Sequence, residues 1–93
     1  AIDLAPDNPD YYYWRGTSYH TVAYYKHPAG DYAKAIADKS QAIDLDPNNP
    51  DYYYSRGKSY HTAAYEKHPA GDYAKAIADC TKAIELDPNN PDY

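Results

Sequence analysis

Apolar and small residues recur along this chain at spacings of three and four, and segments containing proline and glycine interrupt them at 27–30, 46–50 and 68–71. Such a spacing is typical of amphipathic helices, and proline and glycine are typical of the connections between helices. Four long stretches lie between the breaks, so the pattern predicts four helices that alternate in direction. We expect them at residues 10–27, 31–45, 51–68 and 72–86.

Residues that favour the start or the end of a helix stand at these boundaries. Asn49 can cap the free amide groups of the third helix, and Pro50 suits its first position. Asp72 can cap the fourth helix in the same way. Pro69 and Gly71 should end the third helix, because proline cannot continue a helix and glycine favours its C-terminal cap.

The third helix carries two stripes at spacings of four, three and four. One stripe is Tyr53, Gly57, Tyr60 and Ala64, and the other is Tyr54, Lys58, His61 and Tyr65. The first alternates large and small residues, as a packed face does. Glycine costs about 1 kcal/mol inside a helix, so Gly57 indicates a close approach to Ala76. Of the three consecutive tyrosines, we expect Tyr53 in the core, Tyr52 against a neighbouring repeat and Tyr54 at the surface.

The fourth helix has a single apolar stripe, which we expect to be buried. It consists of Tyr73, Ala76, Ile77, Cys80, Ala83 and Ile84. Within it, Cys80 replaces Lys39 of the earlier part of the chain. We interpret Cys80 as a small buried filler and not as a nucleophile, because the pattern places no histidine beside it.

The chain also repeats itself. Residues 1–41 and 42–82 differ at only nine positions, namely 5, 7, 14, 17, 22, 25, 39, 40 and 41. Identity this high indicates a recent duplication or a deliberate design, and units this similar are expected to stack on one another. We therefore predict one repeat domain over 1–93. It divides into the tail of a preceding unit at 1–7, unit one at 8–48, unit two at 49–89 and the start of a next unit at 90–93.

One unit resembles a tetratricopeptide repeat (TPR). The matching residues are Tyr53, Gly57 and Tyr60, then Gly71, Asp72 and Tyr73, Ala76, Ala83, and finally Leu86, Asp87 and Pro88. The unit is 41 residues long, against about 34 in the family, so it is similar to a long-repeat variant of about 42 residues. The seven extra residues lie between Tyr60 and Gly71. They represent either two further turns of the first helix or a loop insertion, and the absence of a breaker in "HTAAYEK" favours the longer helix.

The resemblance implies an all-α fold, in which antiparallel helix hairpins stack as a right-handed α-solenoid. It also implies a non-catalytic scaffold whose concave groove, lined by the first helix of each repeat, binds a peptide or a protein. The groove positions are Asp10, Tyr13, Thr17, His20, Tyr24, Asp51, Tyr54, Lys58, His61 and Tyr65. Some members grip a C-terminal carboxylate with a clamp of Lys, Asn and Arg. Of such a clamp only Lys58 is present here, so this mode of binding is not expected.

Composition narrows the class of partner. The formal net charge is −5 and no cluster of Lys and Arg is present, which argues against nucleic acid and against an anionic membrane surface. The chain contains 14 tyrosines, whose rigid amphipathic rings give contact area at low entropic cost. No apolar run approaches the ~20 residues of a membrane span. The single cysteine, Cys80, favours a reducing, cytoplasm-like compartment.

Histidine and aspartate clusters are accounted for without metal binding. His20 and His27 are seven residues apart, as are His61 and His68, and seven helical residues span about 10.5 Å, too far for one ion. The aspartates of "DPNNPD" act as helix stops and caps. No nucleophile–base pair or phosphate-binding loop is present, so we expect no enzyme, no cofactor and no metal. Trp14 fits three roles equally well: a packing residue, a binding hot spot or an introduced fluorophore.

The two ends of the chain suggest a second function. Residues 1–4 repeat the tail of a second helix, and residues 90–93 repeat the beginning of a first helix. Repeat arrays normally carry polar capping helices, and usually need at least about three units for stability. The alternative function is therefore a structural or designed module that stacks head to tail into a superhelical array. In that array Tyr93 of one copy would lead toward Ala1 of the next.

Overall fold

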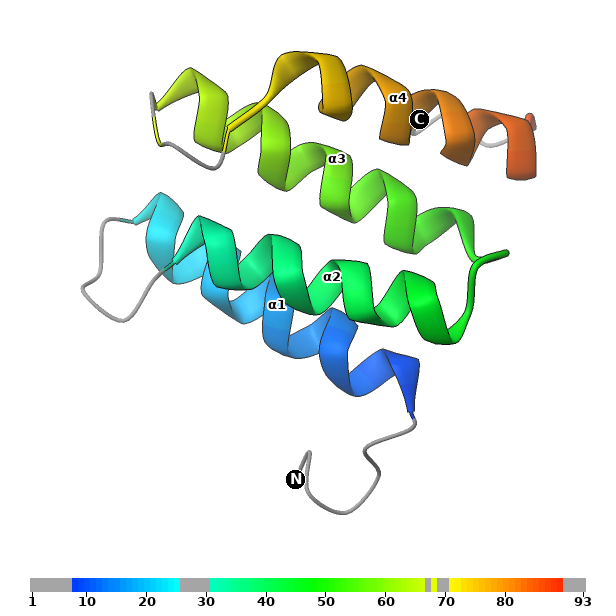
Figure 1. Cartoon of the computed structure of the whole chain (residues 1–93), viewed down its shortest axis with the longest axis horizontal. Coiled ribbons are helices and arrows are strands. Elements are labelled where there is room, and N and C mark those ends of the chain that lie inside the picture. The colour runs from blue at the N-terminus through cyan, green and yellow to red at the C-terminus, as the bar shows by residue number, and fades with distance from the viewer. Residues whose placement is uncertain (1–7, 26–30, 67, 69–70, 90–93) are drawn as a thin grey trace.

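The computed structural model describes residues 8–25, 31–66, 68 and 71–89. They form four α-helices: α1 (Pro9–Tyr24), α2 (Tyr32–Leu45), α3 (Pro50–Tyr65) and α4 (Tyr73–Leu86). Successive helices run in opposite directions, so α1–α2 and α3–α4 are two antiparallel hairpins (Figure 1). The all-α, helix-hairpin fold predicted from the sequence is confirmed.

The helices begin where the sequence predicts. Asn49 Oδ1 accepts a hydrogen bond from the amide of Asp51 at 3.0 Å, and Pro50 occupies the first turn of α3. Asp72 Oδ1 accepts from the amide of Lys75 at 3.0 Å at the start of α4. The equivalent residues cap α1 and α2 in the same way. Each cap satisfies amide groups that the helix itself leaves without an acceptor.

The end of α3 differs from the prediction. The helix passes Thr62 without a break, as the longer-helix interpretation requires, but it ends at Tyr65 and not at His68. The reason is that the chain turns back on itself: the amide of His68 donates to Ala63 O at 2.8 Å. The extra residues are thus divided between the last turn of α3 and the connection. The first helix ends at Tyr24, and its predicted end, His27, lies outside the described residues.

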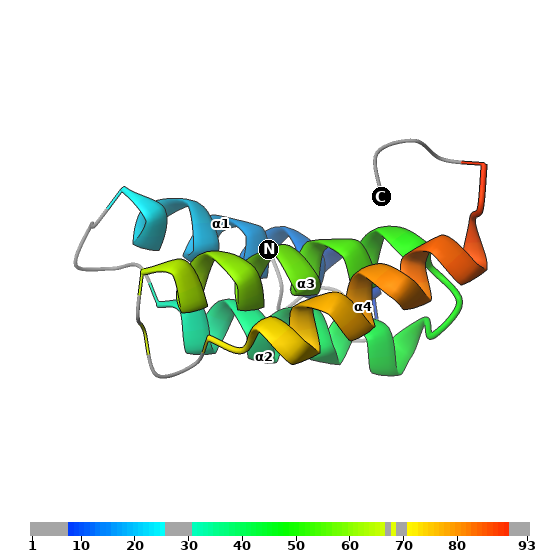
Figure 2. The same ribbon diagram turned by 90° about the horizontal axis from the view of Figure 1, so that it is seen from above.

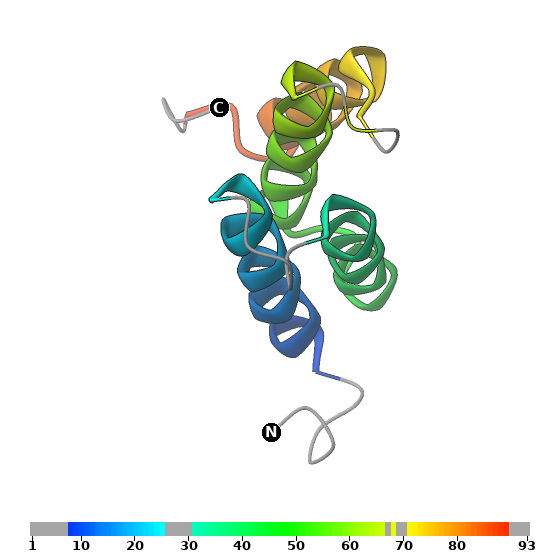
Figure 3. The ribbon, with the colours of Figure 1, turned by 90° about the vertical axis from the view of Figure 1, so that its left-hand side faces the viewer.

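The four helices form two layers, and α3 is the central element. It contacts α1, α2 and α4. Seen along and across the helices, α1 and α3 lie next to each other, while α2 and α4 lie on one side of them (Figures 2 and 3). Each hairpin therefore contributes its first helix to one layer and its second helix to the other.

The predicted apolar stripe is buried in α2 and largely open in α4. In α2 all six of its positions are buried: Tyr32, Ala35, Ile36, Lys39, Ala42 and Ile43. Of the six equivalent stripe positions in α4, only Ala76 and Ala83 are buried. The prediction is therefore wrong for Tyr73, Ile77 and Ile84, which are exposed, and for Cys80, which is half-buried. The reason is tertiary, because α3 contacts α2 and no further described helix covers the same face of α4.

The buried residues of α3 are Tyr52, Ser55, Gly57, Ser59 and Ala63. Of these, only Gly57 belongs to the predicted packed stripe. The predicted core position of Tyr53 holds only in part: the ring packs against the core cluster but is only partly buried, and its hydroxyl donates to Pro47 O at 3.0 Å. The predicted contact between Tyr52 and a neighbouring repeat is confirmed by the Tyr13 ring, 5.2 Å away between centroids.

Glycine allows the two helices of each hairpin to approach closely. A Cβ atom on Gly57 would lie 3.1 Å from the carbonyl oxygen of Ala76 and 3.1 Å from Cβ of Asp79. The predicted meeting of Gly57 and Ala76 is therefore confirmed. Gly16 has the same role in the first hairpin, where an added Cβ would lie 2.9 Å from Ala35 O.

Candidate functional site

The predicted groove residues lie on α1 and α3, the two neighbouring helices of one layer (Figure 2). Those exposed to solvent are Asp10, Tyr24, Asp51, Lys58, His61 and Tyr65. Those that are half-buried are Tyr13, Thr17, His20 and Tyr54. The structure thus places an interrupted row of aromatic rings along each of the two helices.

On α1, two of these residues contact α3. The Tyr52 hydroxyl donates a hydrogen bond to Asp10 Oδ1. The Tyr13 ring lies against the Tyr52 ring and also against Trp14, with centroids 5.1 Å apart. Burial is the main cause that raises the pKa of Tyr13. Asp10 and Tyr13 therefore help to join the two hairpins.

His20 belongs to a network of hydrogen bonds that crosses from the first hairpin to the second. His20 Nδ1 lies 2.7 Å from Ser59 Oγ. The same Ser59 oxygen accepts from Lys39 Nζ at 2.7 Å, and Lys39 also donates to the backbone carbonyl of Ser55 at 3.0 Å. Since Lys39 occupies an acceptor position of Ser59, the Ser59 hydroxyl proton is available to His20. This network connects α1, α2 and α3.

Burial lowers the pKa of both basic groups in this hydrogen-bonded network, Lys39 and His20. It lowers the pKa of Lys39 to about 7, with the charge of Lys58 adding to the effect. It also lowers the pKa of His20 to about 4, helped by the charges of Lys39 and Lys58 and opposed by Glu66. His20 is therefore neutral at pH 7, as an imidazole that accepts a hydrogen bond at Nδ1 must be.

The free energy of unfolding should rise with pH between about 4 and 6.5 because of His20. The folded pKa of about 4 lies below the ordinary value of 6.5, so in this window the unfolded chain binds more protons and stability increases with pH. After allowance for solvent screening of the half-buried ring, we expect a gain of about 1–2 kcal/mol. Urea denaturation at both ends of the window would measure it. A His20→Gln chain should lose this part of the gain. An equal gain in both chains would contradict the lowered pKa of the half-buried His20.

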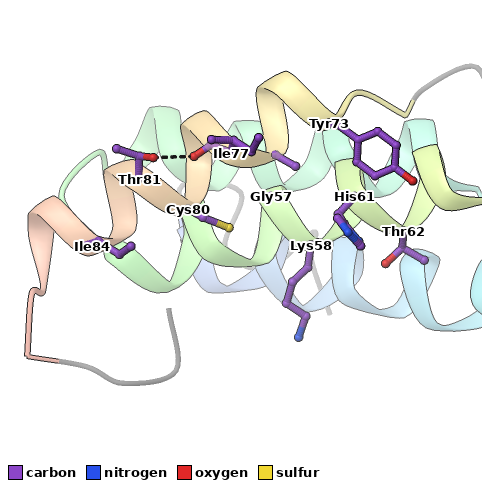
Figure 4. Close-up of a pocket in the computed structure, with 10 residues that line it drawn as sticks. Gly57, Lys58, His61, Thr62, Tyr73, Ile77, Cys80, Thr81 and Ile84 are labelled. Atoms are coloured by element: carbon purple, nitrogen blue, oxygen red, sulfur yellow. Dashed lines mark hydrogen bonds between the residues drawn. The ribbon is translucent and has the colours of Figure 1, made fainter.

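On the second hairpin, Lys58 and His61 border an open groove. Lys58 Nζ lies over the Tyr54 ring, 5.3 Å from its centroid, and the His61 ring meets the Tyr73 ring edge-on at 5.3 Å. We call the hollow beside them the α3–α4 groove, and Figure 4 shows the side chains that line it. Its volume is about 590 Å³. It is lined by Gly57, Lys58, His61, Thr62, Tyr73, Ala76, Ile77, Cys80, Thr81 and Ile84. Apart from its rim, the lining is apolar or small.

In each hairpin an ion pair joins the two helices, a contact that the sequence pattern did not predict. Arg15 binds both carboxylate oxygens of Asp38, with each distance 2.7 Å. Arg56 binds Asp79 in the same way, at 2.8 and 2.7 Å, and a third nitrogen donates to Ser40 Oγ at 3.2 Å. The available signal was an Arg–Asp spacing of 23 residues in both units. Buried aspartates of this kind require a partner.

Within the described ranges, no three His, Cys, Asp or Glu side chains lie close enough together to hold a metal ion. Burial, followed by the Asp79 charge, raises the pKa of the Cys80 thiol, which keeps it protonated and a poor nucleophile at pH 7. His68 meets the Tyr32 ring edge-on at 5.5 Å, and His27 lies outside the described residues.

Over the described part of the chain, no helix combines the length and the apolar character that a membrane crossing requires.

Comparison with known families agrees with the fold and the repeat. A TPR repeat model matches residues 23–63, and a tetratricopeptide repeat model matches residues 57–90. No curated protein and no solved structure matches the chain significantly. The two hairpins and the two matched models define a helical-repeat scaffold of the kind that binds other proteins. The chain belongs to the tetratricopeptide repeat family, whose members are generally non-catalytic.

Proposed function

We propose that the tyrosine-rich surface of α1 and α3 binds an extended peptide or a protein segment and that the chain has no catalytic activity of its own. The observation that carries the proposal is the pair Tyr24 and Tyr65. They stand at equivalent ends of α1 and α3, and both rings are exposed. Large exposed aromatic rings repeated at one place on neighbouring helices are unusual unless a partner covers them.

The rest of the surface supports a peptide as the ligand. Tyr13 and Tyr54 continue the aromatic rows toward the helix N-termini, where Asp10 and Asp51 add negative charge. Lys58 supplies a cation at the centre. Rigid rings with hydroxyl groups can contact apolar side chains and also bond a peptide backbone. The net charge of −5 supports the exclusion of nucleic acid as a partner.

Selection from a random-peptide library tests this function. Peptides selected on the chain should bind a Tyr24→Ser/Tyr65→Ser variant at least about tenfold more weakly, because two aromatic anchors are removed. The matched control is Gln41→Ser/Lys82→Ser, a pair of exposed residues at equivalent positions on α2 and α4. It should change the affinity by less than about twofold. Equal binding by the wild type and the tyrosine variant would contradict the proposed surface.

A second candidate is self-assembly, in which copies stack head to tail as a right-handed superhelix. The observation that favours it is the difference between two equivalent faces: the apolar stripe is buried in α2 and open in α4. The proposed unit boundaries, 8–48 and 49–89, would then continue from one copy to the next. The predicted approach of Tyr93 to Ala1 involves residues outside those described.

A further inference from the structure

The contact between the two hairpins serves as an internal example of how one unit covers another. We call it the internal seam, formed by α3 on the α1–α2 hairpin. Tyr32 of α2 is 3% exposed there, whereas its equivalent Tyr73 of α4 is 49% exposed. Ile36 is 8% exposed and its equivalent Ile77 is 68% exposed. The α3–α4 groove is thus the same surface as the one that α3 covers in the first hairpin.

The helix that would fit this groove is already present in the chain. α1 and α3 have the same sequence at all but three of their 16 positions, and α3 is the helix that covers α2. We call the matching surface of α1 its leading face, formed by Tyr11, Trp14, Ser18 and Val22. Trp14 and Ser18 are exposed and the other two are half-buried, so this face is accessible to a second copy.

Two of the three differences fall on this leading face, and both make it larger. Trp14 stands where α3 has Ser55, and Val22 stands where α3 has Ala63. Trp14 is 63% exposed, although Ser55 is buried in the internal seam. A large apolar side chain in solvent, at a position that is otherwise an interface position, indicates an interface.

The opposite surface changes in the complementary direction. In the internal seam, the long Lys39 side chain reaches the small residues Ser55 and Ser59. In the α3–α4 groove, Cys80 replaces Lys39. The internal seam thus joins a large residue to small ones, and the α3–α4 groove offers a small residue to the large leading face. Complementary volume is what close packing between surfaces requires, and sulfur also makes favourable contacts with aromatic rings.

The polar contacts of the internal seam can be repeated as well. His20 bonds Ser59, and the equivalent pair is His61 with Ser18 of a second copy. Tyr52 bonds Asp10, and the equivalent pair is Tyr11 of a second copy with Asp51.

We propose that the α3–α4 groove binds α1 of a second copy of this chain, with Trp14 of that copy over Cys80. In the internal seam the large Lys39 meets the small Ser55. In the contact between copies the large Trp14 would meet the small Cys80, so the two contacts differ while each pairs a large residue with a small one. This inference rests on self-assembly, the second candidate function, and adds the residues that determine its register. The contact is heterologous and leaves a free groove at one end and a free leading face at the other, so it propagates.

Trp14 is the single tryptophan of the chain and reports on the contact directly. Sedimentation velocity over a concentration series from about 1 µM to about 1 mM, the range of ordinary to weak association, should show a rising average mass. The tryptophan emission should shift to shorter wavelength, and acrylamide quenching should fall, over the same range. A chain that stays monomeric throughout would overturn self-assembly and this inference together.

Three variants separate the inference from self-assembly in general. Trp14→Ser and Cys80→Lys should each weaken association by at least about tenfold, the first by removing the anchor and the second by filling its site. The triple variant Trp14→Ser/Val22→Ala/Cys80→Lys recreates the residues of the internal seam and should recover most of the lost affinity. Circular dichroism should show unchanged helix content, because Trp14 is exposed and Cys80 lines an open groove.

The other possible outcomes decide whether the pairing of Trp14 with Cys80 determines the contact. Association that neither single variant changes would overturn the inference and leave self-assembly through another surface. If both single variants associated more weakly and the triple variant did not recover the affinity, the inference would also be overturned, because the matching of residue sizes would then not be the cause of the association. Emission that does not respond while the mass rises would place Trp14 outside the interface.

Discussion

A Gly71→Ala chain is expected to lose about 3 kcal/mol of stability, near the upper end of the cost of overpacking. An added Cβ at this position would overlap the backbone N and Cα atoms of Ala64 and lie 2.6 Å from the backbone carbon of Ala63. These are backbone atoms of α3 and cannot rotate away as a side chain can. The connection is also fixed from both sides, since the Gly71 amide donates to His68 O at 2.9 Å and the Asp72 amide donates to Tyr60 O at 3.3 Å.

Urea denaturation followed by circular dichroism would measure this loss, and Gly57→Ala is its control. At Gly57 the nearest atoms to an added Cβ are 3.1 Å away, and alanine gains about 1 kcal/mol of helix propensity. The two effects nearly cancel, so we expect a change within about 1 kcal/mol. If Gly71→Ala were as mild as Gly57→Ala, the return of the chain against the end of α3 would be wrongly described.

An Asp79→Ala chain is expected to lose about 3 kcal/mol or more, because it leaves the Arg56 guanidinium without its carboxylate. Asp79 is buried, and Arg56 makes two hydrogen bonds to it. Only 22% of the Arg56 side chain is exposed, so water can replace little of what is lost. Asp79 also lies beside Gly57, where the helices of the hairpin are closest.

The first hairpin provides the matched comparison. Asp38→Ala removes the same interaction from Arg15, whose side chain is 45% exposed. Water can solvate that guanidinium more completely, so the loss should be about half as large. Denaturant midpoints at constant m-value would rank the two variants. Equal losses in both hairpins would show that the exposure of the arginine does not control the strength of these ion pairs.

The local sequence was sufficient wherever short-range chemistry decides the structure. Asn49 and Asp72 cap their helices as predicted, because a cap requires only a side-chain oxygen two or three residues from a free amide. Gly57 lies close to Ala76 as predicted, because glycine inside a helix is destabilising and therefore indicates a close approach of two helices. The end of α3 was missed by three residues, since the turn at His68 depends on where the chain has to return.

The buried face of α3 could not be found from hydrophobicity. Ser55 and Ser59 are buried although serine is usually exposed, because they are small and because Lys39 bonds to them. Lys39 itself can be buried because it donates hydrogen bonds to the Ser55 carbonyl and the Ser59 hydroxyl. A pattern of apolar residues cannot mark positions whose burial depends on a polar partner from a different helix.

The sequence by itself determined the repeat, the four helices, their caps and the family, because these depend on local propensity and on periodicity. It also placed the predicted groove residues on the two first helices of the hairpins. Only the tertiary structure decided which copies of a repeated stripe are buried. Ile36 and Ile77 occupy equivalent positions in nearly identical helices, yet the first is covered and the second is open. Burial depends on whether a neighbouring helix lies above a residue, and the residue itself carries no information about that neighbour.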